Sequence, residues 1–225
     1  MKKVIWLAVA ILVGALFLCS SLSIASSSGP GISAEQALKN LMDGNKRYVD
    51  GKARGIMAHG QQVREGLVAG QKPYAVVLCC SDSRVPPELI FDEGLGEIFV
   101  VRVAGNLAEK GAVLGSVEYA AEHLGVPLLL VLGHEKCGAV KATVESQGHG
   151  EGNIGHIISG IAPALIKAKG TEAEAVADAN LDIVKKNITA GSPVLAKLVS
   201  EGRLKIVTAK YHIDHGDVEL RQGLK

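Results

Sequence analysis

Residues 74–84 read YAVVLCCSDSR, an apolar run that leads directly into a cluster of reactive side chains. A short run without charges is typical of a strand buried on both faces of a sheet. A second run, LLLVL at residues 128–132, leads into GHEKCG at residues 133–138. Open α/β sheets place their ligand sites at the carboxyl ends of parallel strands. We therefore expect these two reactive segments to lie together.

Two further apolar runs, residues 98–103 and 204–209, raise the number of predicted buried strands to four. Helical patterns lie between the strands. Such alternation predicts an α/β fold with a largely parallel sheet flanked by helices. Residues 210–220 contain His-Gly-Asp between short β-like runs, which predicts a terminal hairpin. The helical patterns cover residues 87–91, 112–124 and a long region at 153–198.

An N-terminal helical arm is predicted before the first strand. Ser33-Ala-Glu-Gln36 resembles a capping box, and apolar residues follow it at helical spacing. We expect Gly44-Asn45 to end or interrupt this helix. A second helical stretch covers residues 56–69, and Gly70 is placed to cap it.

The first 25 residues have the pattern of a signal peptide. Lys2 and Lys3 precede an apolar stretch at residues 4–18, and Ser23-Ile24-Ala25 forms a small-x-small cleavage site. We predict cleavage after Ala25, a linker at residues 26–31 and one domain at residues 32–225. The protein is then exported, periplasmic or secreted, with no stable membrane insertion after cleavage. The alternative is an uncleaved membrane anchor, since residues 4–25 are just long enough to span a bilayer.

The composition argues against a nucleic-acid-binding protein and against a small disulfide-linked scaffold. The net charge is +1 and aromatic residues make up 4% of the chain, so neither a basic patch nor a base-stacking platform for nucleic acid is indicated. The four cysteines do not form a disulfide scaffold. Cleavage would leave three cysteines, Cys79, Cys80 and Cys137. An odd number of cysteines cannot all form disulfides within one chain, which needs an explanation in an oxidising compartment. A metal ion that holds two thiolates would explain two of them.

Cys80, His134 and Cys137 offer the sulfur and nitrogen ligands that zinc prefers. Three protein ligands with an open position mark a catalytic zinc site, and four mark a structural one. Asp82 could accept a hydrogen bond from a zinc-bound hydroxide, or become the fourth ligand itself. Arg84 could hold this carboxylate bidentately and keep it ionised. The plainer alternative is that Asp82 and Arg84 form an ion pair that stabilises a turn.

Four segments of the chain stand in a specific order and spacing: CSDSRVPPE at residues 80–88, FVVRVAGN at 99–106, SVEYA at 116–120 and GHEKCG at 133–138. Together they resemble the β-class carbonic anhydrases. The resemblance runs from about Ile32 to the C-terminus.

The resemblance implies one zinc ion per subunit, held by Cys80, His134 and Cys137, beside an Asp82–Arg84 dyad. It implies that Gln71 reaches the active site and donates to the substrate, and that the backbone at Gly138 lines the pocket. The implied sheet has four parallel strands and an antiparallel edge strand. The implied assembly is a homodimer, sometimes paired into a tetramer, with the active-site cleft at the dimer interface and the N-terminal helices embracing the partner.

The implied reaction is the reversible hydration of CO2 to bicarbonate and a proton, with zinc-bound hydroxide as the nucleophile and Asp82 orienting it. The resting state is open, with water as the fourth ligand, or closed, with Asp82 bound to zinc. Two alternatives remain: a zinc hydrolase of carbonyl sulfide or carbon disulfide on the same scaffold, and a non-catalytic zinc-binding protein. Residues 146–156 are the hardest to match to the family.

Overall fold

The computed structural model describes residues 29–224. Its centre is a five-stranded sheet in the order β2-β1-β3-β4-β5, parallel except for β5, which runs antiparallel to β4. The predicted fold class and the terminal hairpin are therefore confirmed, while the predicted signal peptide lies outside the described residues. The strands are β1 (Ala75–Cys79), β2 (Ile98–Arg102), β3 (Leu128–His134), β4 (Lys205–Tyr211) and β5 (Val218–Gln222).

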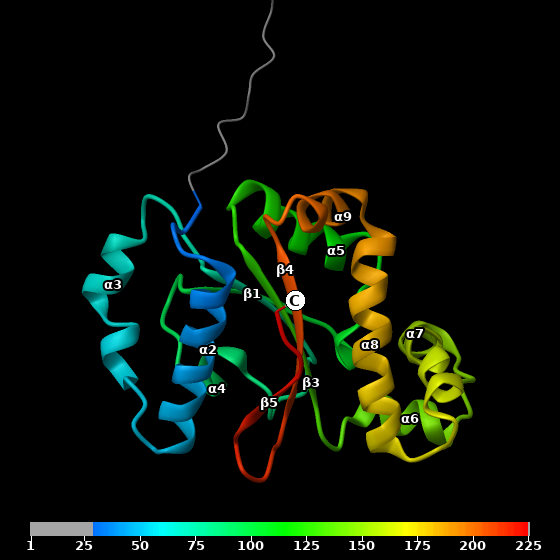
Figure 1. Ribbon diagram of the computed structural model, residues 1–225. Helices are drawn as coiled ribbons and strands as arrows, with labels where there is room; N and C mark the ends of the chain where they lie inside the picture. The colour runs from blue at the N-terminus through cyan, green and yellow to red at the C-terminus, as the bar shows by residue number, and fades with distance from the viewer. Residues whose placement is uncertain (1–28, 225) are drawn as a thin grey trace, which may run out of the picture.

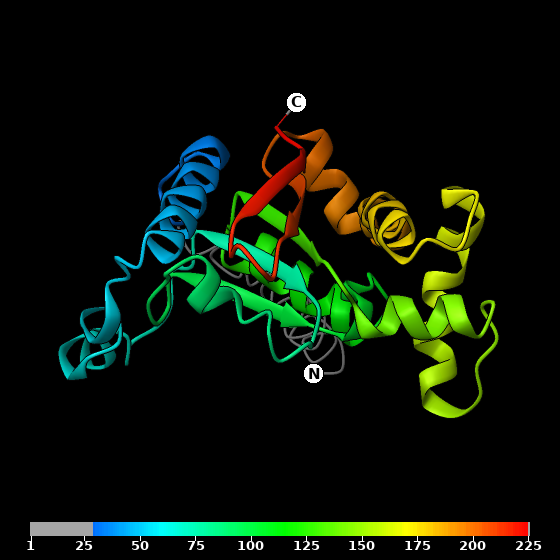
Figure 2. The ribbon, with the colours of Figure 1, turned by 90° about the horizontal axis from the view of Figure 1, so that it is seen from below.

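Helices cover both faces of the sheet (Figures 1 and 2). One face packs against α2 (Ala34–Val49) and α4 (Pro87–Ile90). The other packs against α5 (Ala112–Glu118), α8 (Ala173–Gly191) and α9 (Pro193–Ser200). The remaining helices are α3 (Gln61–Gly66), α6 (Gly138–Glu145) and α7 (Gly152–Ala168), and none of the helices in residues 29–224 is long and apolar enough to cross a membrane.

Alternating side chains of the buried strands enter two different cores. Val77 of β1 packs on the α2 side, and its neighbour Val76 packs on the α8 side. Every residue of β1 and β3 is buried, which is why both strands read as continuous apolar runs. A third apolar cluster, under the carboxyl ends of the strands, contains Cys80 and Cys137 together with residues of α6, α7 and α8.

The helix α2 does not end at Gly44-Asn45, so that prediction was wrong. A Cβ at Gly44 would lie 1.8 Å from the Phe91 carbonyl oxygen, so glycine is present because another backbone approaches closely. Asn45 is buried, and its amide donates to the carbonyls of Ile90 (3.1 Å) and Gly216 (2.8 Å) and accepts from the Val218 amide (3.0 Å). Asn45 thereby joins α2 to the end of α4 and to the β4–β5 hairpin.

Three other predicted helical stretches are divided. The stretch predicted at residues 56–69 is a 3-10 turn (Gly55–Ala58) followed by the short α3. The two are separate because the Ala58 carbonyl accepts from the Leu95 amide instead of from an amide of its own helix. Residues 112–124 hold α5 and a π-helical turn at Tyr119–His123. The long region at 153–198 is α7, α8 and α9, with breaks at the left-handed Lys169 and at Ser192, which caps α9.

We expect Asn45→Ala to lower the free energy of unfolding by about 2–3 kcal/mol, since it removes three hydrogen bonds and leaves buried backbone groups without partners. Urea unfolding measures the change. Asn40→Ala, on the same helix but with only Gln36 as a side-chain partner, is the control and should change stability by less than about 0.5 kcal/mol. Equal effects of the two substitutions would contradict the joining role of Asn45.

Candidate metal centre

Three potential metal ligands meet at the carboxyl ends of β1 and β3. Cys79 pairs with Leu132, so Cys80 leaves the sheet beside the end of β3, where His134 is the last residue. Cys137 follows as the N-cap of α6. The ligand atoms of Cys80, His134 and Cys137 all lie within 4.8 Å of one another, and all three residues are buried.

His134 presents one ring nitrogen to this cluster. Its Nδ1 lies 2.8 Å from the carbonyl oxygen of Glu135, which can only accept, so Nδ1 carries the proton and donates. The Nε2 atom is buried and has no hydrogen-bond partner within the described part of the chain. The carbonyl therefore fixes the orientation of the ring and leaves the lone pair of Nε2 free beside two thiols. This arrangement fits a zinc ion.

The two thiol groups of the cluster are strongly coupled. The hydrogen bond from Cys137 is the largest cause that lowers the pKa of Cys80, and it raises the pKa of Cys137. The Gly105 amide also donates to Cys80 Sγ at 3.4 Å, which favours the thiolate further. Cys79 differs, because burial raises its pKa to about 12 and it packs in the apolar core beside α2.

Asp82 and Arg84 form a forked ion pair beside the cluster. Arg84 Nε and Nη2 donate to the two carboxylate oxygens at 2.9 and 2.7 Å, and the Arg84 amide donates to Oδ1 at 3.0 Å. These bonds hold the pKa of Asp82 well below its usual range. Asp82 Oδ2 lies 4.0 Å from His134 Nε2, and Arg84 also donates to the Lys136 carbonyl (3.1 Å). The pair therefore connects the two segments that carry the ligands.

Gln71 and Gly138, the other predicted site residues, have different positions. Gly138 is the exposed first residue of α6, directly after Cys137. Gln71 is exposed and precedes β1, whereas Cys80 follows it, so a strand of roughly 15 Å separates them. No hydrogen bond between residues 29–224 of one chain joins Gln71 to the cluster. Gln71 is thus not brought to the ligands within one chain.

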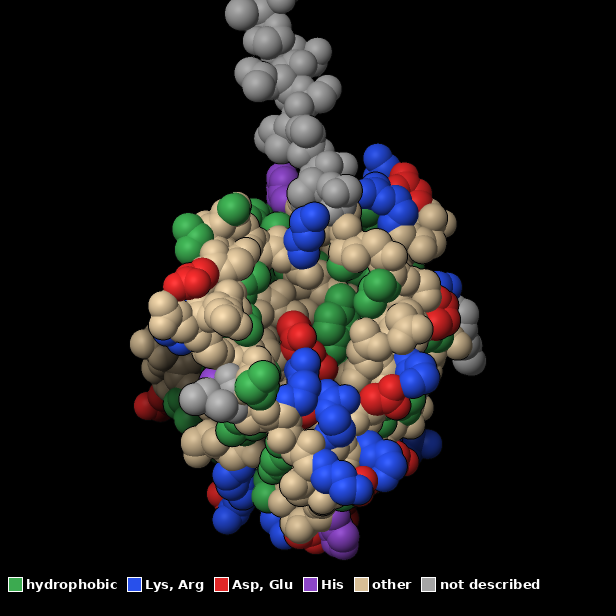
Figure 3. All heavy atoms as spheres, turned by 90° about the vertical axis from the view of Figure 1, so that its left-hand side faces the viewer, with side chains coloured by type: hydrophobic (Ala, Val, Ile, Leu, Met, Phe, Trp, Pro, Cys, Tyr) green, Lys and Arg blue, Asp and Glu red, His purple; other side chains and the backbone are tan. Residues whose placement is uncertain are grey.

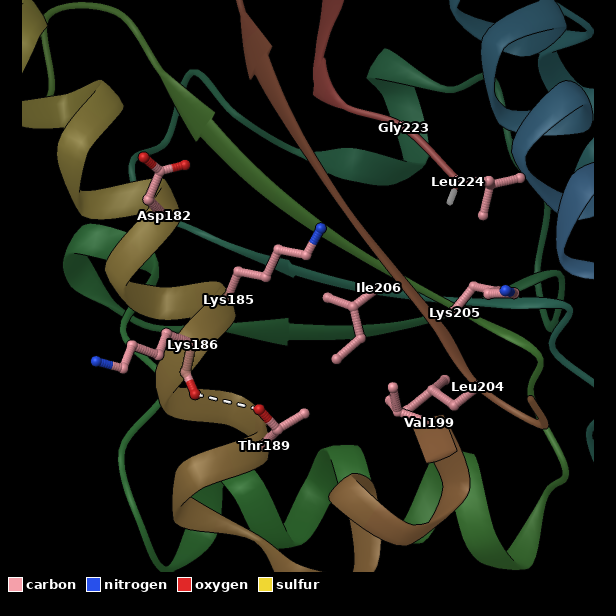
Figure 4. Close-up of a pocket in the computed structure, with 10 residues that line it drawn as sticks. All are labelled: Asp182, Lys185, Lys186, Thr189, Val199, Leu204, Lys205, Ile206, Gly223 and Leu224. Atoms are coloured by element: carbon pink, nitrogen blue, oxygen red, sulfur yellow. Dashed lines mark hydrogen bonds between the residues drawn. The ribbon is translucent and has the colours of Figure 1, made fainter. Parts of the chain in front are cut away.

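A cavity of about 510 Å³ lies elsewhere, between α8 and β4 (Figure 4). It is lined by Lys205, the first residue of β4, and by Lys186 and Thr189 in the second half of α8. It therefore lies at the end of the sheet opposite the ligands. Within residues 29–224, Cys80, His134 and Cys137 are the one group of three or more Cys, His, Asp or Glu side chains that converge as metal ligands do.

Comparison with known proteins identifies the family. The family model described as carbonic anhydrase matches residues 75–218, which include all three clustered ligands. The structure of Coccomyxa β-carbonic anhydrase in complex with acetazolamide aligns with a TM-score of 0.65 and 27% identity, covering 82% of this chain and 86% of that one. The chain belongs to the β-carbonic anhydrase family.

Full-length relatives support the same assignment. A carbonic anhydrase of Mycolicibacterium smegmatis is 39% identical over 201 residues, covering 87% of this chain and 97% of the relative. Carbonic anhydrase 2 of Mycobacterium tuberculosis is 38% identical over 204 residues, with coverage of 87% and 96%. The chain is accordingly a carbonic anhydrase enzyme, and CO2 hydration is the general activity of its family.

Sequence reasoning assigned no role to Arg102 or Asn180. Arg102, at the end of β2, donates to the carbonyls of Cys80 (3.1 Å) and Asp82 (2.6 Å). Asn180 of α8 donates to the Gly105 carbonyl at 3.0 Å. Arg102 lies in the segment at residues 99–106, one of the four that resemble the family. That resemblance could have pointed to a role for Arg102. Asn180 lies in a long helical region where nothing in the sequence points to the metal centre.

We expect His134→Ala to lose stoichiometric zinc, because the cluster then has only two ligands. Zinc content after dialysis, measured by atomic absorption, should fall from about one ion per chain to a small fraction. His215→Ala is the control, since His215 is exposed and its side chain pairs only with Asp214. Full zinc occupancy in His134→Ala would remove His134 from the ligand set.

Proposed function

We propose that this chain catalyses the reversible hydration of CO2 to bicarbonate at one zinc ion held by Cys80, His134 and Cys137. The observation that carries the proposal is the convergence of two thiols and an unpartnered imidazole nitrogen, with the Asp82–Arg84 pair beside them. A structural zinc site has no need of an ionised carboxylate next to its ligands. The convergence therefore favours catalysis over a purely structural role.

Zinc with an open coordination position lowers the pKa of water to about 7 and so supplies hydroxide near neutral pH. Asp82 is ionised and can only accept hydrogen bonds, so it would orient the attacking oxygen by accepting a hydrogen bond from it. Arg84 fixes the direction of the carboxylate through two parallel bonds. Because Arg84 engages both oxygens of Asp82, we propose the open arrangement, in which Asp82 is not a fourth ligand.

A second copy of this chain would complete the site. Gln71 lies away from the ligands of its own chain, so we propose that it reaches the active site of a partner subunit and donates to CO2 there. Figure 3 faces the α3 side of the molecule and shows apolar side chains at the surface among charged ones. Met57 (81% exposed) and Val68 (86% exposed) flank α3. These surfaces support a homodimer, and tetrameric β-carbonic anhydrases of Sordaria macrospora share the fold (TM-score 0.64, 22% identity).

Gly138 has a supporting role in this proposal. It begins α6 directly after Cys137, and a Cβ there would meet no atom of residues 29–224 within 4 Å apart from its chain neighbours and its own helix backbone. We propose that the backbone at Gly138 lines the CO2 pocket.

We also propose that the protein is exported and cleaved after Ala25, to the periplasm or beyond. The charged, apolar and small-residue pattern of residues 1–25 supports this. Fractionation of the source cells, with N-terminal sequencing of the product, tests it. A mature protein that begins at Ser26 is the expected product, and an intact N-terminus in the membrane fraction would indicate an anchor.

We expect Asp82→Asn to keep zinc but lower the rate of CO2 hydration by roughly 10- to 100-fold, the usual effect of losing a group that orients a metal site. The asparagine amide does not attract the Arg84 guanidinium as the carboxylate does. Stopped-flow hydration assays between about pH 6.5 and 9, a range around the ionisation of zinc-bound water, together with zinc analysis, measure both effects.

Asp43→Asn is the matched control, since Asp43 pairs with Lys39 on the outside of α2. Unchanged hydration by Asp82→Asn would remove Asp82 from the mechanism. A wild-type protein that binds zinc but hydrates no CO2 at any pH would overturn the proposed substrate, and carbonyl sulfide and carbon disulfide would be tested next.

We expect Val68→Glu to dissociate the oligomer and to lower activity, because Val68 lies three residues before Gln71 and a buried charge opposes subunit contact. Sedimentation velocity measures the assembly. Ile166→Glu is the control: Ile166 is equally exposed, at 83%, but belongs to α7 on the opposite side of the molecule (Figure 1). Dissociation by both variants, or by neither, would count against a partner at the α3 side.

A further inference from the structure

Asn180 of α8 is a buried polar residue, 2% exposed, in the apolar interior beside the metal centre. Its Nδ2 donates to the Gly105 carbonyl at 3.0 Å, and its Oδ1 is buried without a partner among the described residues. A buried amide with an unsatisfied oxygen is a cost to folding. An apolar residue of similar volume would avoid that cost but would leave the buried Gly105 carbonyl without a donor, so the asparagine is explained by what it does at Gly105.

Gly105, the residue that Asn180 holds, touches the metal centre directly. Its amide donates to Cys80 Sγ at 3.4 Å. Gly105 has φ +70°, and a Cβ there would lie 2.7 Å from Cδ1 of Ile161, so no other residue fits without strain. Asn180 therefore holds the carbonyl of the same residue whose amide donates to Cys80.

Helix α8 also contacts the chain segment that carries His134 and Cys137. Glu174, in the first turn of α8, accepts from the Lys136 amide at 2.9 Å, between His134 and Cys137. Leu181 packs over Gly133, where an added Cβ would lie 3.1 Å from the leucine side chain. Helix α8 therefore contacts the segment that carries His134 and Cys137, and also contacts Gly105, which donates to Cys80.

We propose that Asn180 is a positioning residue for the Cys80 ligand, holding Gly105 so that its amide donates to the sulfur. This inference rests on the zinc ligands proposed above. The N–H···S bond withdraws negative charge from the thiolate and fixes the direction of the sulfur. Both effects act on how strongly and in what geometry Cys80 binds a metal ion.

The test replaces Asn180 by leucine, which has a similar volume and no hydrogen-bonding atoms. Asn180→Leu removes the orphaned Oδ1 but leaves the buried Gly105 carbonyl without its donor, so its urea midpoint should stay close to that of the wild type. Its zinc affinity, measured by competition with a chelator, should nevertheless fall about 10- to 100-fold. In the Co²⁺-substituted protein, the thiolate-to-metal charge-transfer band should shift to longer wavelength, since the sulfur has lost a donor.

Ile188→Ala is the matched control. Ile188 is fully buried on the same helix but belongs to the core between α8 and the middle of the sheet. It should lower the urea midpoint and leave the Co²⁺ spectrum and zinc affinity unchanged. If Asn180→Leu loses stability and keeps a wild-type Co²⁺ spectrum, its role is structural and the proposal is overturned.

A measurement on the wild type avoids any dependence on folding of the variant. With ¹¹³Cd²⁺ in place of zinc, NMR should show a scalar coupling between the metal and the Gly105 amide proton, transmitted through the hydrogen bond to Cys80 Sγ. Absence of this coupling in a protein that binds one ¹¹³Cd²⁺ through Cys80 would overturn the proposal and leave the ligand assignment intact. Failure of the wild type to bind the metal through Cys80 would instead refute the proposed site itself.

Discussion

The parallel register between β1 and β3 is the constraint on which the metal centre depends. Cys79 lies opposite Leu132, so the chain leaves β1 at Cys80 just where β3 continues to His134. A shift of one residue would move Cys80 by roughly 3.3 Å, more than metal coordination tolerates, and would exchange the side chains that face α2 with those that face α8. The two apolar cores on either side of the sheet resist that shift. The packing that stabilises the sheet therefore also fixes the distance between the ligands.

Arginine side chains then connect the segments that extend beyond the sheet. Arg102, from the neighbouring strand β2, binds the carbonyls of Cys80 and Asp82, and Arg84 binds the Asp82 carboxylate and the Lys136 carbonyl. These carbonyls lie past the last strand pairs, where the sheet no longer supplies hydrogen bonds, and the Asp82 carbonyl also accepts from the Val85 amide at 3.0 Å. Arg84 also favours the charged forms of Asp82 and of the Cys80 and Cys137 thiols. The two arginines thus order the loops, and Arg84 in addition favours negative charge in the site.

Much of the fold could be predicted from sequence because both faces of β1 and β3 are buried, which leaves short continuous apolar runs in the sequence. Reactive residues directly after those runs were then expected to meet, and the structure brings Cys80, His134, Cys137, Asp82 and Arg84 together. Gly44 was misinterpreted because a glycine required by a close backbone contact looks, in sequence, like one that ends a helix. Gln71 could not be placed because the ligands of its own chain lie at the other end of β1. Asn180 was missed because its partner Gly105 lies 75 residues away.

Helix α8 shows how the core and the metal centre depend on each other. Leu181 and Ile188 anchor the helix in the apolar core, while Glu174 binds the Lys136 amide and Asn180 binds Gly105. All four side chains project from one rigid helix, so the groups that bury apolar surface and the groups that bind the loops cannot move independently. A rotation of α8 that improved packing at Ile188 would carry Asn180 away from Gly105. The orphaned oxygen of Asn180 is consistent with this coupling, because a helix free to optimise its own packing would not keep an unsatisfied amide in its core.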